Sequence, residues 1–281
     1  MIVVRTVADL REALRDRRTA PVGLVPTMGA LHEGHATLLR AARRDNATVV
    51  MSIFVNPTQF NEQSDLAAYP RSEEADLALA EAEGVDVVFA PDAAEVYPQG
   101  FATTVSVTGA IAETLEGAER GRAHFDGVAT VVTKLLLGAL PDHAYFGAKD
   151  AQQVAVIRRL VADLGIPVTL MVCPTSRDDD GLARSSRNTR LSPEERARAL
   201  AIPRALQEVT DAAATGITDP EALRARAMAT LEASGIRPEY VALVDPATFA
   251  PVPVVEGVVL VAIAARVGAT RLIDNTVIGG A

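Results

Sequence analysis

Residues 22–35 have the sequence VGLVPTMGALHEGH, and this stretch decides the fold. Its first six residues are mainly apolar and β-branched, which predicts a buried strand over 22–27. A glycine-containing loop follows, and the run through Leu38–Arg44 predicts a helix that begins near Gly34. A strand, a loop and a helix in this order form the unit from which α/β sheets are built.

The same alternation continues to about residue 175. Strands that are apolar on both faces are typical of a parallel sheet covered by helices on each side. The sequence therefore predicts an α/β fold with a doubly wound, Rossmann-like parallel sheet. The further strands are predicted at 48–55, 85–89, 144–146 and 166–172, and the helices at 73–83, 128–137 and 152–164.

The chain changes character after residue 175. Residues 175–190 are polar and predict a long loop, whose polarity, Gly181 and lack of apolar anchors predict mobility. We expect a Rossmann-like domain over 1–175 and a smaller α+β carboxyl-terminal domain over 176–281. After the loop, Ser192, Pro193 and Glu195 form a helix-start signal. The elements of the second domain are predicted as helices at 193–214 and 219–234, followed by strands at 240–244, 258–264 and 271–277.

Composition excludes several classes of protein. The 281 residues are 49% hydrophobic, which is enough for a large core and excludes a disordered acidic chain. Asp and Glu number 36 against 27 Lys and Arg, so we expect no nucleic-acid partner. The single Cys173 excludes an internal disulfide and indicates a reducing, cytoplasmic setting. Early charges and a longest apolar run of only 257–265 predict neither a signal peptide nor a membrane span.

The loop after the first predicted strand is the strongest candidate for a phosphate site. Ligands of doubly wound sheets lie beyond the carboxyl ends of the strands, where a helix amino terminus presents free N–H groups. Gly29 and Gly34 permit close backbone approach, and His32 and His35 can donate to phosphate oxygens. One alternative is a pair of structural histidines. The other is a zinc pair, although H-E-G-H lacks both the i, i+4 spacing and a third ligand.

Two further segments could contact anionic oxygens. Lys149 lies between a predicted strand and a predicted helix, where it can neutralise a phosphate, and Asp150 could hold a ribose hydroxyl. Residues 185–187 offer two hydroxyls and a guanidinium on the polar loop. The alternatives are helix capping for the first segment and an exposed linker for the second. The aspartates at 178–180 are interpreted as solvated loop charges, with a magnesium role as the alternative.

A last set of residues suits a small substrate with polar and apolar parts. Asn56 and Gln59 follow the second long strand, and their amides can bind a neutral or hydroxylated group. Val128, Val131 and Val132 lie on one helix face, a pattern that is also that of plain core.

Four segments in one order closely resemble the pantothenate synthetase (pantoate–β-alanine ligase) family of the nucleotidylyltransferase superfamily. They are PTMGALHEGH at 26–35, VNPTQF at 55–60, FGAKDAQQ at 146–153 and DGLARSSRN at 180–188. Together with YPR at 69–71, HFDGV at 124–128 and TRLIDN at 270–275, they extend the resemblance over nearly the whole chain.

The resemblance implies an AMP-forming ligase that condenses pantoate with β-alanine through a pantoyl adenylate. ATP would be a substrate with Mg²⁺, no organic cofactor would be tightly bound, and the protein would be a homodimer. The first domain would bind ATP and pantoate, and the loop at 176–190 would be a phosphate-binding lid. No protein nucleophile is required, so positioning and charge neutralisation would carry the catalysis.

The resemblance also assigns residues. His35, His32 and Lys149 would be catalytic. ATP would be held by Met28, Gly29, Ala30, Leu31, His32, Glu33, Gly34, His35, Gly147, Ala148, Lys149, Asp150, Ser176, Arg184, Ser185, Ser186 and Arg187. Pantoate and β-alanine would be held by Pro26, Met28, Asn56, Gln59, Gln153, Val128, Val131 and Val132, with Gln59 facing both.

Three positions depart from the family pattern. Ala148 replaces a glutamate, and Arg184 replaces a leucine or methionine. Asp76 lies near the region where the family places metal, but Ala75 and Leu79 beside it cannot be ligands, so no metal residue is predicted. The alternatives are another adenylyl-transferring enzyme of the superfamily and a catalytically silent nucleotide-binding regulator.

Overall fold

The structure is a computed structural model in which residues 1–61, 66, 67 and 69–279 are described. The chain divides into two compact units. The first unit comprises residues 1–148 and 156–174, and the second comprises 149–155 and 175–281. The functions assigned to the two predicted domains stay predictions.

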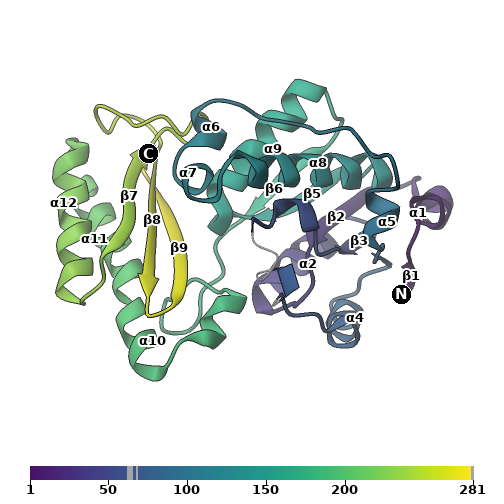
Figure 1. The fold of residues 1–281 in the computed structure, drawn as a ribbon, viewed down its shortest axis with the longest axis horizontal. Helices are drawn as coiled ribbons and strands as arrows, with labels where there is room; N and C mark the ends of the chain where they lie inside the picture. The colour runs from purple at the N-terminus through teal and green to yellow at the C-terminus, as the bar shows by residue number, and fades with distance from the viewer. Residues whose placement is uncertain (62–65, 68, 280–281) are drawn as a thin grey trace. The chain divides into compact units, whose positions relative to one another are not determined.

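The first unit is built on a six-stranded parallel sheet, which confirms the predicted fold class (Figure 1). The strand order is β1-β4-β3-β2-β5-β6. From β2 the chain adds β3 and β4 on one side and later β5 and β6 on the other, so the order reverses between β2 and β5. The strands are β1 (Ile2–Val4), β2 (Val22–Thr27), β3 (Thr48–Ile53), β4 (Val87–Phe89), β5 (His143–Gly147) and β6 (Thr169–Cys173).

Helices cover both faces of this sheet (Figure 1). The helices α2 and α4 bury Leu39, Ala42 and Ala80 against Val25 and Met51 of the strands, and α1 packs with α8 on the opposite face. The helices are α1 (Val7–Leu14), α2 (Glu33–Asp45), α4 (Glu73–Ala82), α5 (Ala93–Val96), α6 (Ala110–Glu113), α7 (Glu116–Arg120), α8 (Arg122–Ala139) and α9 (Ala151–Leu164). Single 3₁₀ turns are η1 (Arg15–Arg17), η2 (Pro57–Gln59) and η3 (Ala148–Asp150).

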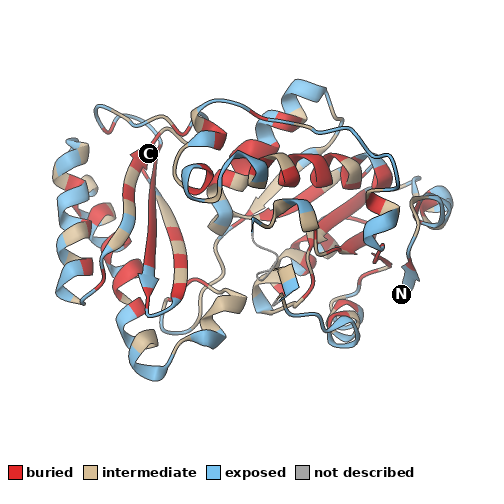
Figure 2. Ribbon diagram, in the orientation of Figure 1, coloured by how far each residue is buried: buried red, intermediate tan, exposed pale blue. Residues whose placement is uncertain are grey.

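The second unit contains a three-stranded antiparallel sheet in the order β7-β8-β9, which confirms the three strands and the α+β class predicted for this part of the chain. The helices α11 and α12 pack against each other and against this sheet (Figure 1). The elements are η4 (Ser186–Arg190), α10 (Pro193–Ala199), α11 (Ala201–Ala214), α12 (Pro220–Ala233), β7 (Pro238–Val244), β8 (Val259–Val267) and β9 (Thr270–Ile278). Buried residues concentrate on the strands and on the inner faces of the helices (Figure 2).

The helix predicted over 193–214 is two helices that meet at Leu200. Pro203 has no N–H to donate to the carbonyl of Ala199, so the ladder of hydrogen bonds is interrupted there. The predicted start of α10 is confirmed, because Glu195 N–H donates to Ser192 Oγ at 3.2 Å and Ser192 N–H donates to Glu195 at 2.9 Å. Among the described residues, no helix combines the length and hydropathy that crossing a membrane requires.

Candidate active site

Two loops leave the sheet side by side at the point where the strand order reverses. The strands β2 and β5 are parallel neighbours, with Gly23 opposite His143 and Leu24 opposite Ala144. Both strands therefore end at the same edge, where crevices of doubly wound sheets bind ligands. The loop after β2 carries the predicted phosphate contacts from Met28 onward, and β5 ends on Gly147, which Ala148 follows as the first residue of η3.

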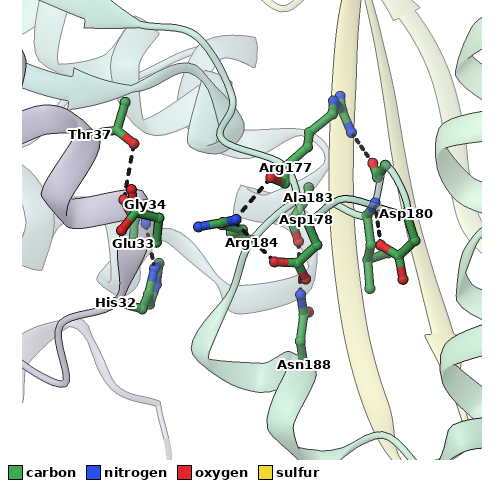
Figure 3. A network of polar contacts seen from close by, with 12 residues as sticks. His32, Glu33, Gly34, Thr37, Arg177, Asp178, Asp180, Ala183, Arg184 and Asn188 are labelled. Atoms are coloured by element: carbon green, nitrogen blue, oxygen red, sulfur yellow. Dashed lines mark hydrogen bonds and ion pairs between the residues drawn. The ribbon is translucent and has the colours of Figure 1, made fainter.

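The two histidines of the first loop form a reciprocal cap at the start of α2, and Figure 3 shows the His32 half of it. Nδ1 of His32 accepts the backbone N–H of Gly34 at 3.1 Å, and Nδ1 of His35 accepts the backbone N–H of His32 at 3.2 Å. The ring centroids lie 4.3 Å apart. The alternative of a pair of structural histidines is therefore correct in part, since both rings stabilise the helix start.

This cap fixes the tautomer of each neutral ring. A ring nitrogen that accepts a hydrogen bond carries no proton, so the proton of a neutral imidazole lies on the other nitrogen. His32 and His35 therefore both carry N–H at Nε2. That atom can donate to an anionic oxygen while Nδ1 keeps the helix start in place.

The expectation of free backbone donors at this helix start is wrong for most of the loop. Thr27 Oγ1 accepts the N–H of Gly29 at 3.2 Å, and the histidine rings accept those of His32 and Gly34. The N–H of His35 donates to the carbonyl of His32 at 2.8 Å. A phosphate at this loop would consequently rely on histidine Nε2–H groups more than on these amides.

The side chain of Gln59 is oriented by buried neighbours. Asn56 is 1% exposed, and its Nδ2 donates to Gln59 Oε1 at 3.0 Å and to the carbonyl of Gly127 at 3.1 Å. Gln59 Nε2 then points to Met28, with its nitrogen 3.1 Å from Sδ. Because a thioether is a weak acceptor, Gln59 presents a donor that a substrate oxygen can use. Asn56, a predicted substrate contact, lies behind Gln59 in the described structure.

A tyrosine that the sequence analysis did not select holds Asn56 in turn. Tyr97 Oη donates to Asn56 Oδ1 at 2.7 Å and lies 3.2 Å from Thr58 Oγ1. Burial raises the pKa of Tyr97, against the opposing effect of its hydrogen bonds to Thr58 and Asn56. The phenol therefore stays protonated and can act as a donor to Asn56.

The helix α8 packs directly on η2, which carries Gln59. A Cβ at Gly127 would lie 2.5 Å from the carbonyl oxygen of Thr58, so only glycine permits this approach. His124 Nδ1 lies 2.8 Å from the carbonyl oxygen of Gln59. On the same helix, the three valines predicted to contact pantoate, Val128, Val131 and Val132, are all buried. Pro26 is half-buried near the end of β2.

In the second unit, a small pocket gathers predicted phosphate contacts from different segments. Lys149, Ser185 and Arg187 line it together with Arg271 and Asp274 of β9. Three of these five side chains are cationic, which suits an anionic ligand. Arg271 also pairs with Glu239 at 2.6 Å.

The segment around Lys149 is tied to β9 through its backbone. Asn275 Nδ2 donates to the carbonyl of Lys149 at 2.8 Å. Nζ of Lys149 lies 3.6 Å from Oδ1 of Asp150, and the Lys149 side chain is 17% exposed. Gln153 follows on α9 and is half-buried.

The start of the predicted lid is a small hairpin. Arg184 N–H donates to the carbonyl of Ser176 at 2.9 Å, and Asp178 N–H donates to that of Leu182 at 2.8 Å. Two predicted ATP contacts, Ser176 and Arg184, thus lie opposite each other. Gly181, with a φ of +91°, closes the turn.

The expected lack of apolar anchors in this loop is wrong. Leu182 and Ala183 are 3% and 5% exposed, and Leu182 belongs to the core of the second unit. The interpretation of the aspartates as solvated charges is also wrong for two of them. Arg184 Nε pairs with Asp178 at 3.0 Å (Figure 3), and Arg196 pairs with both Asp178 and Asp180 at 2.8 Å.

An ion pair with a buried carboxylate fixes the same hairpin to β9. Both carboxylate oxygens of Asp274 accept from Arg177, at 2.7 and 3.1 Å, and the Asp274 side chain is 2% exposed. Such a two-point contact fixes the position of the arginine as well as its charge. Arg184, which replaces the leucine or methionine of the family pattern, also stabilises the hairpin, since its Nε donates to the carbonyl of Arg177 at 3.0 Å.

The residues that the sequence analysis missed share one property. Tyr97, Gly127 and Asp274 act through buried contacts with other residues. The HFDGV and TRLIDN segments contained two of them, but single positions there carried no separate signal. Across the described part of the chain, no three His, Cys, Asp or Glu side chains form a group that could hold a metal ion.

A family model described as pantoate-beta-alanine ligase matches residues 2–277. The chain belongs to the pantoate–β-alanine ligase family. Pantothenate synthetase from Rhizorhabdus wittichii is 53% identical over 278 residues, which are 98% of each chain. Pantothenate synthetase from Roseiflexus sp. is 51% identical over 279 residues, which are 99% of each chain.

Solved structures of the pantoate–β-alanine ligase family share this fold. Pantothenate synthetase from Thermus thermophilus matches with a TM-score of 0.92 and 46% identity, over 98% of this chain and 99% of that one. Pantoate-beta-alanine ligase from Francisella tularensis, solved in complex with beta-gamma ATP and beta-alanine, matches with a TM-score of 0.80 and 34% identity. That match covers 98% of this chain and 97% of the other. The family and the ligase class predicted from the sequence are confirmed.

Proposed function

We propose that this protein condenses pantoate with β-alanine to give pantothenate, with ATP converted to AMP and pyrophosphate. The observation that carries the proposal is the histidine pair after β2. Nδ1 of His32 and of His35 accepts a backbone N–H, so each neutral ring carries a donor proton at Nε2. Two such donors at the reversal point of a doubly wound sheet suit a triphosphate.

The reaction has two steps. A pantoate carboxylate oxygen attacks the α-phosphorus of ATP, an acyl–O–P bond forms, and pyrophosphate leaves. The amine of β-alanine then attacks the acyl carbonyl, an amide bond forms, a proton leaves the nitrogen, and AMP departs. Neither step requires a protein nucleophile, so binding and charge stabilisation account for the catalysis.

The resemblance assigns nucleotide contacts to residues of each unit. His32 and His35 would donate from Nε2 to triphosphate oxygens, and Lys149 would stabilise the charge that builds on departing pyrophosphate. Residues 176 and 184–187 would contact the phosphates from the hairpin and η4. ATP enters as its Mg²⁺ complex, so the metal arrives with the substrate.

Pantoate and β-alanine would contact a second set of residues. Gln59 Nε2, oriented by Asn56, would donate to an oxygen of pantoate, and Gln153 would provide a second amide. Val128, Val131 and Val132 would form an apolar wall against the two methyl groups. Pro26 and Met28 would complete this part of the pocket.

We further propose a cytoplasmic homodimer that binds no organic cofactor tightly. The absence of a disulfide-forming cysteine pair supports the compartment, and the family supports the dimer. Sedimentation of the purified protein would test the oligomeric state. A monomer at micromolar concentration would contradict it.

Labelled pyrophosphate tests the proposed function most sharply. With ATP, Mg²⁺ and pantoate, but without β-alanine, the enzyme should exchange label from pyrophosphate into ATP. Adding β-alanine should yield pantothenate and AMP in equal amounts. Exchange with a phosphorylated acceptor alone would indicate another adenylyl transferase, and ATP binding without turnover of any acceptor would indicate a regulator.

A further inference from the structure

We propose that Asp76 is a positioning residue that sets the backbone of the nucleotide-binding loop, and this inference rests on the proposed function. Asp76 lies on α4 and is 2% exposed. Its Oδ2 accepts the backbone N–H of Ala30 at 2.9 Å, and its Oδ1 accepts that of Leu31 at 2.7 Å. A residue 46 positions later in the chain thus binds the centre of the loop.

The loop needs such a partner because its backbone is strained. Gly29 has a φ of +78°, and Ala30 has a φ of +50°. Glycine adopts this left-handed region freely, but a residue with a Cβ does so at a cost of roughly 1–2 kcal/mol. Hydrogen bonds of backbone N–H groups to a carboxylate are stronger than those to a neutral acceptor. Asp76 therefore offsets the strain at Ala30.

The close approach of the carboxylate also explains the glycine before Ala30. A Cβ at Gly29 would lie 2.8 Å from Asp76 Oδ2 and 3.1 Å from Ile53 Cγ2. Only glycine fits position 29, because its φ is positive and because a Cβ would collide with the Asp76 carboxylate. The loop and the carboxylate therefore fit each other as a pair.

The position of the histidines depends on this turn. His32 follows Leu31 directly and begins the cap of α2, which fixes the Nε2 atoms of both rings. A change in the direction of the chain at 30–31 would displace the rings together. Asp76 would thereby act on the nucleotide without touching it.

The same contacts argue against a metal at Asp76. Both carboxylate oxygens already accept a backbone N–H, and the neighbouring Ala75 and Leu79 have no ligand atoms in their side chains. A metal there would find a single buried carboxylate, each of whose oxygens already holds a backbone N–H of the turn. The structure therefore assigns Asp76 to the loop.

Direct binding of ATP to Asp76→Asn tests the inference. The amide keeps the shape of the carboxylate but offers one acceptor, so one loop N–H faces a donor. A buried N–H without an acceptor destabilises the backbone conformation that leaves it so. We expect ATP to bind about tenfold more weakly, in EDTA and in Mg²⁺ alike. Gly29→Ala, which disturbs the same contact from the loop side, should weaken ATP binding likewise; unchanged ATP affinity in this variant would contradict the inference if Asp76→Asn does not fold.

Two controls separate positioning from stability. Glu74→Gln changes an exposed charge on the same helix and should leave ATP affinity within about twofold. Tyr145→Phe removes buried hydrogen bonds near the amino ends of the strands, and it should lower the melting temperature without weakening ATP binding.

Three results would overturn the inference. A loss of ATP affinity only in Mg²⁺ would make Asp76 a metal ligand. Unchanged ATP affinity with a lowered melting temperature would make it purely structural, and an equal loss in Tyr145→Phe would make the effect unspecific. The proposed function fails separately, if the wild-type enzyme shows no pantoate-dependent pyrophosphate exchange.

Discussion

The amide nitrogen of Asn56 donates to Oε1 of Gln59 at 3.0 Å, so the orientation of Gln59 is set from inside the protein. An amide can donate or accept, and a flipped Gln59 would present its oxygen to the substrate. Asn56 Oδ1 accepts from Tyr97, which leaves Asn56 Nδ2 as the donor to Gln59. The chain Tyr97–Asn56–Gln59 thus decides which atom Gln59 would present to the proposed substrate.

Replacing Asn56 with aspartate should reverse that orientation. The new carboxylate oxygen would repel Gln59 Oε1 and the carbonyl of Gly127, both of which now accept from Asn56. The loss of a buried partner typically costs about 1–3 kcal/mol, or very roughly 5- to 150-fold in affinity. We expect the KM for pantoate to rise within that range, while ATP affinity changes less than about threefold.

Asn46→Asp is the matched control for this variant. Asn46 is another buried asparagine of the first unit, with hydrogen bonds to Tyr145 and His143. It should lower stability and leave the KM for pantoate unchanged. Equal effects of the two variants on pantoate would show that Asn56 does not act through Gln59.

Two substitutions of His35 should separate its two roles. His35→Asn places an acceptor near the position of Nδ1, so it can keep the cap on His32 N–H, but it cannot reach the position of Nε2. We expect near-normal stability and a fall in turnover of about 100-fold, as for the loss of one preorganised donor. His35→Ala should show the same fall in turnover and lose about 1 kcal/mol of stability with the cap.

Thermal unfolding and steady-state turnover measure these two effects independently. If His35→Asn turned over at a rate close to that of the wild type, the ring would serve only as a helix cap. The structural alternative for the histidine pair would then be the whole explanation.

The sequence was sufficient for the parallel sheet because its strands are continuous apolar runs separated by helices. It also placed the loops at the carboxyl ends of strands, which residue type and position after a strand indicate, but the reversal between β2 and β5 is known only from the structure. It missed β1, because three residues at the start of a chain give too short a pattern to recognise. It joined α10 to α11, because the effect of Pro203 depends on which carbonyl lies four residues before it.

The sequence does not predict which distant residues contact each other, and the reason is physical. Asp76 contacts Ala30, and Arg177 contacts Asp274, across 46 and 97 positions of the chain. Such pairs depend on how strands and helices pack, which local periodicity does not contain. The polarity of residues 175–190 predicts a mobile loop for the same reason. The partners that anchor this loop lie on α10 and β9, and local sequence does not reveal them.

Asp274→Asn should loosen that loop. Asp274 is buried, and its carboxylate receives two hydrogen bonds from Arg177 and one from the N–H of Asn275. The amide variant loses the charge and one acceptor, at a cost of about 1–3 kcal/mol. We expect amide hydrogens at 178 and 184, which are bonded within the hairpin, to exchange faster than in the wild type.

Hydrogen exchange followed by mass spectrometry would measure this effect on the unliganded enzyme. Asp211→Asn, which changes an exposed carboxylate on α11, is the control. Fast exchange at these amides in the wild type would contradict the anchored loop described here. ATP should also bind more weakly to Asp274→Asn, because Ser185 and Arg187 belong to the same segment.

Tyr145 should make stability depend on pH in the alkaline range. Its hydroxyl donates to Asp45 at 3.0 Å and accepts from Asn46 at 2.8 Å, and burial raises the pKa of Tyr145 from 10.0 to about 12. Between pH 10 and 12 the folded protein keeps a proton that the unfolded chain has lost, so the free energy of unfolding falls as the pH rises. Below pH 10 the contribution of Tyr145 is complete.

Urea unfolding should therefore show Tyr145→Phe less stable than the wild type at pH 8, by about 1–3 kcal/mol, with the difference shrinking by pH 11. A difference that stayed constant over this range would mean that the phenol does not titrate differently in the two states.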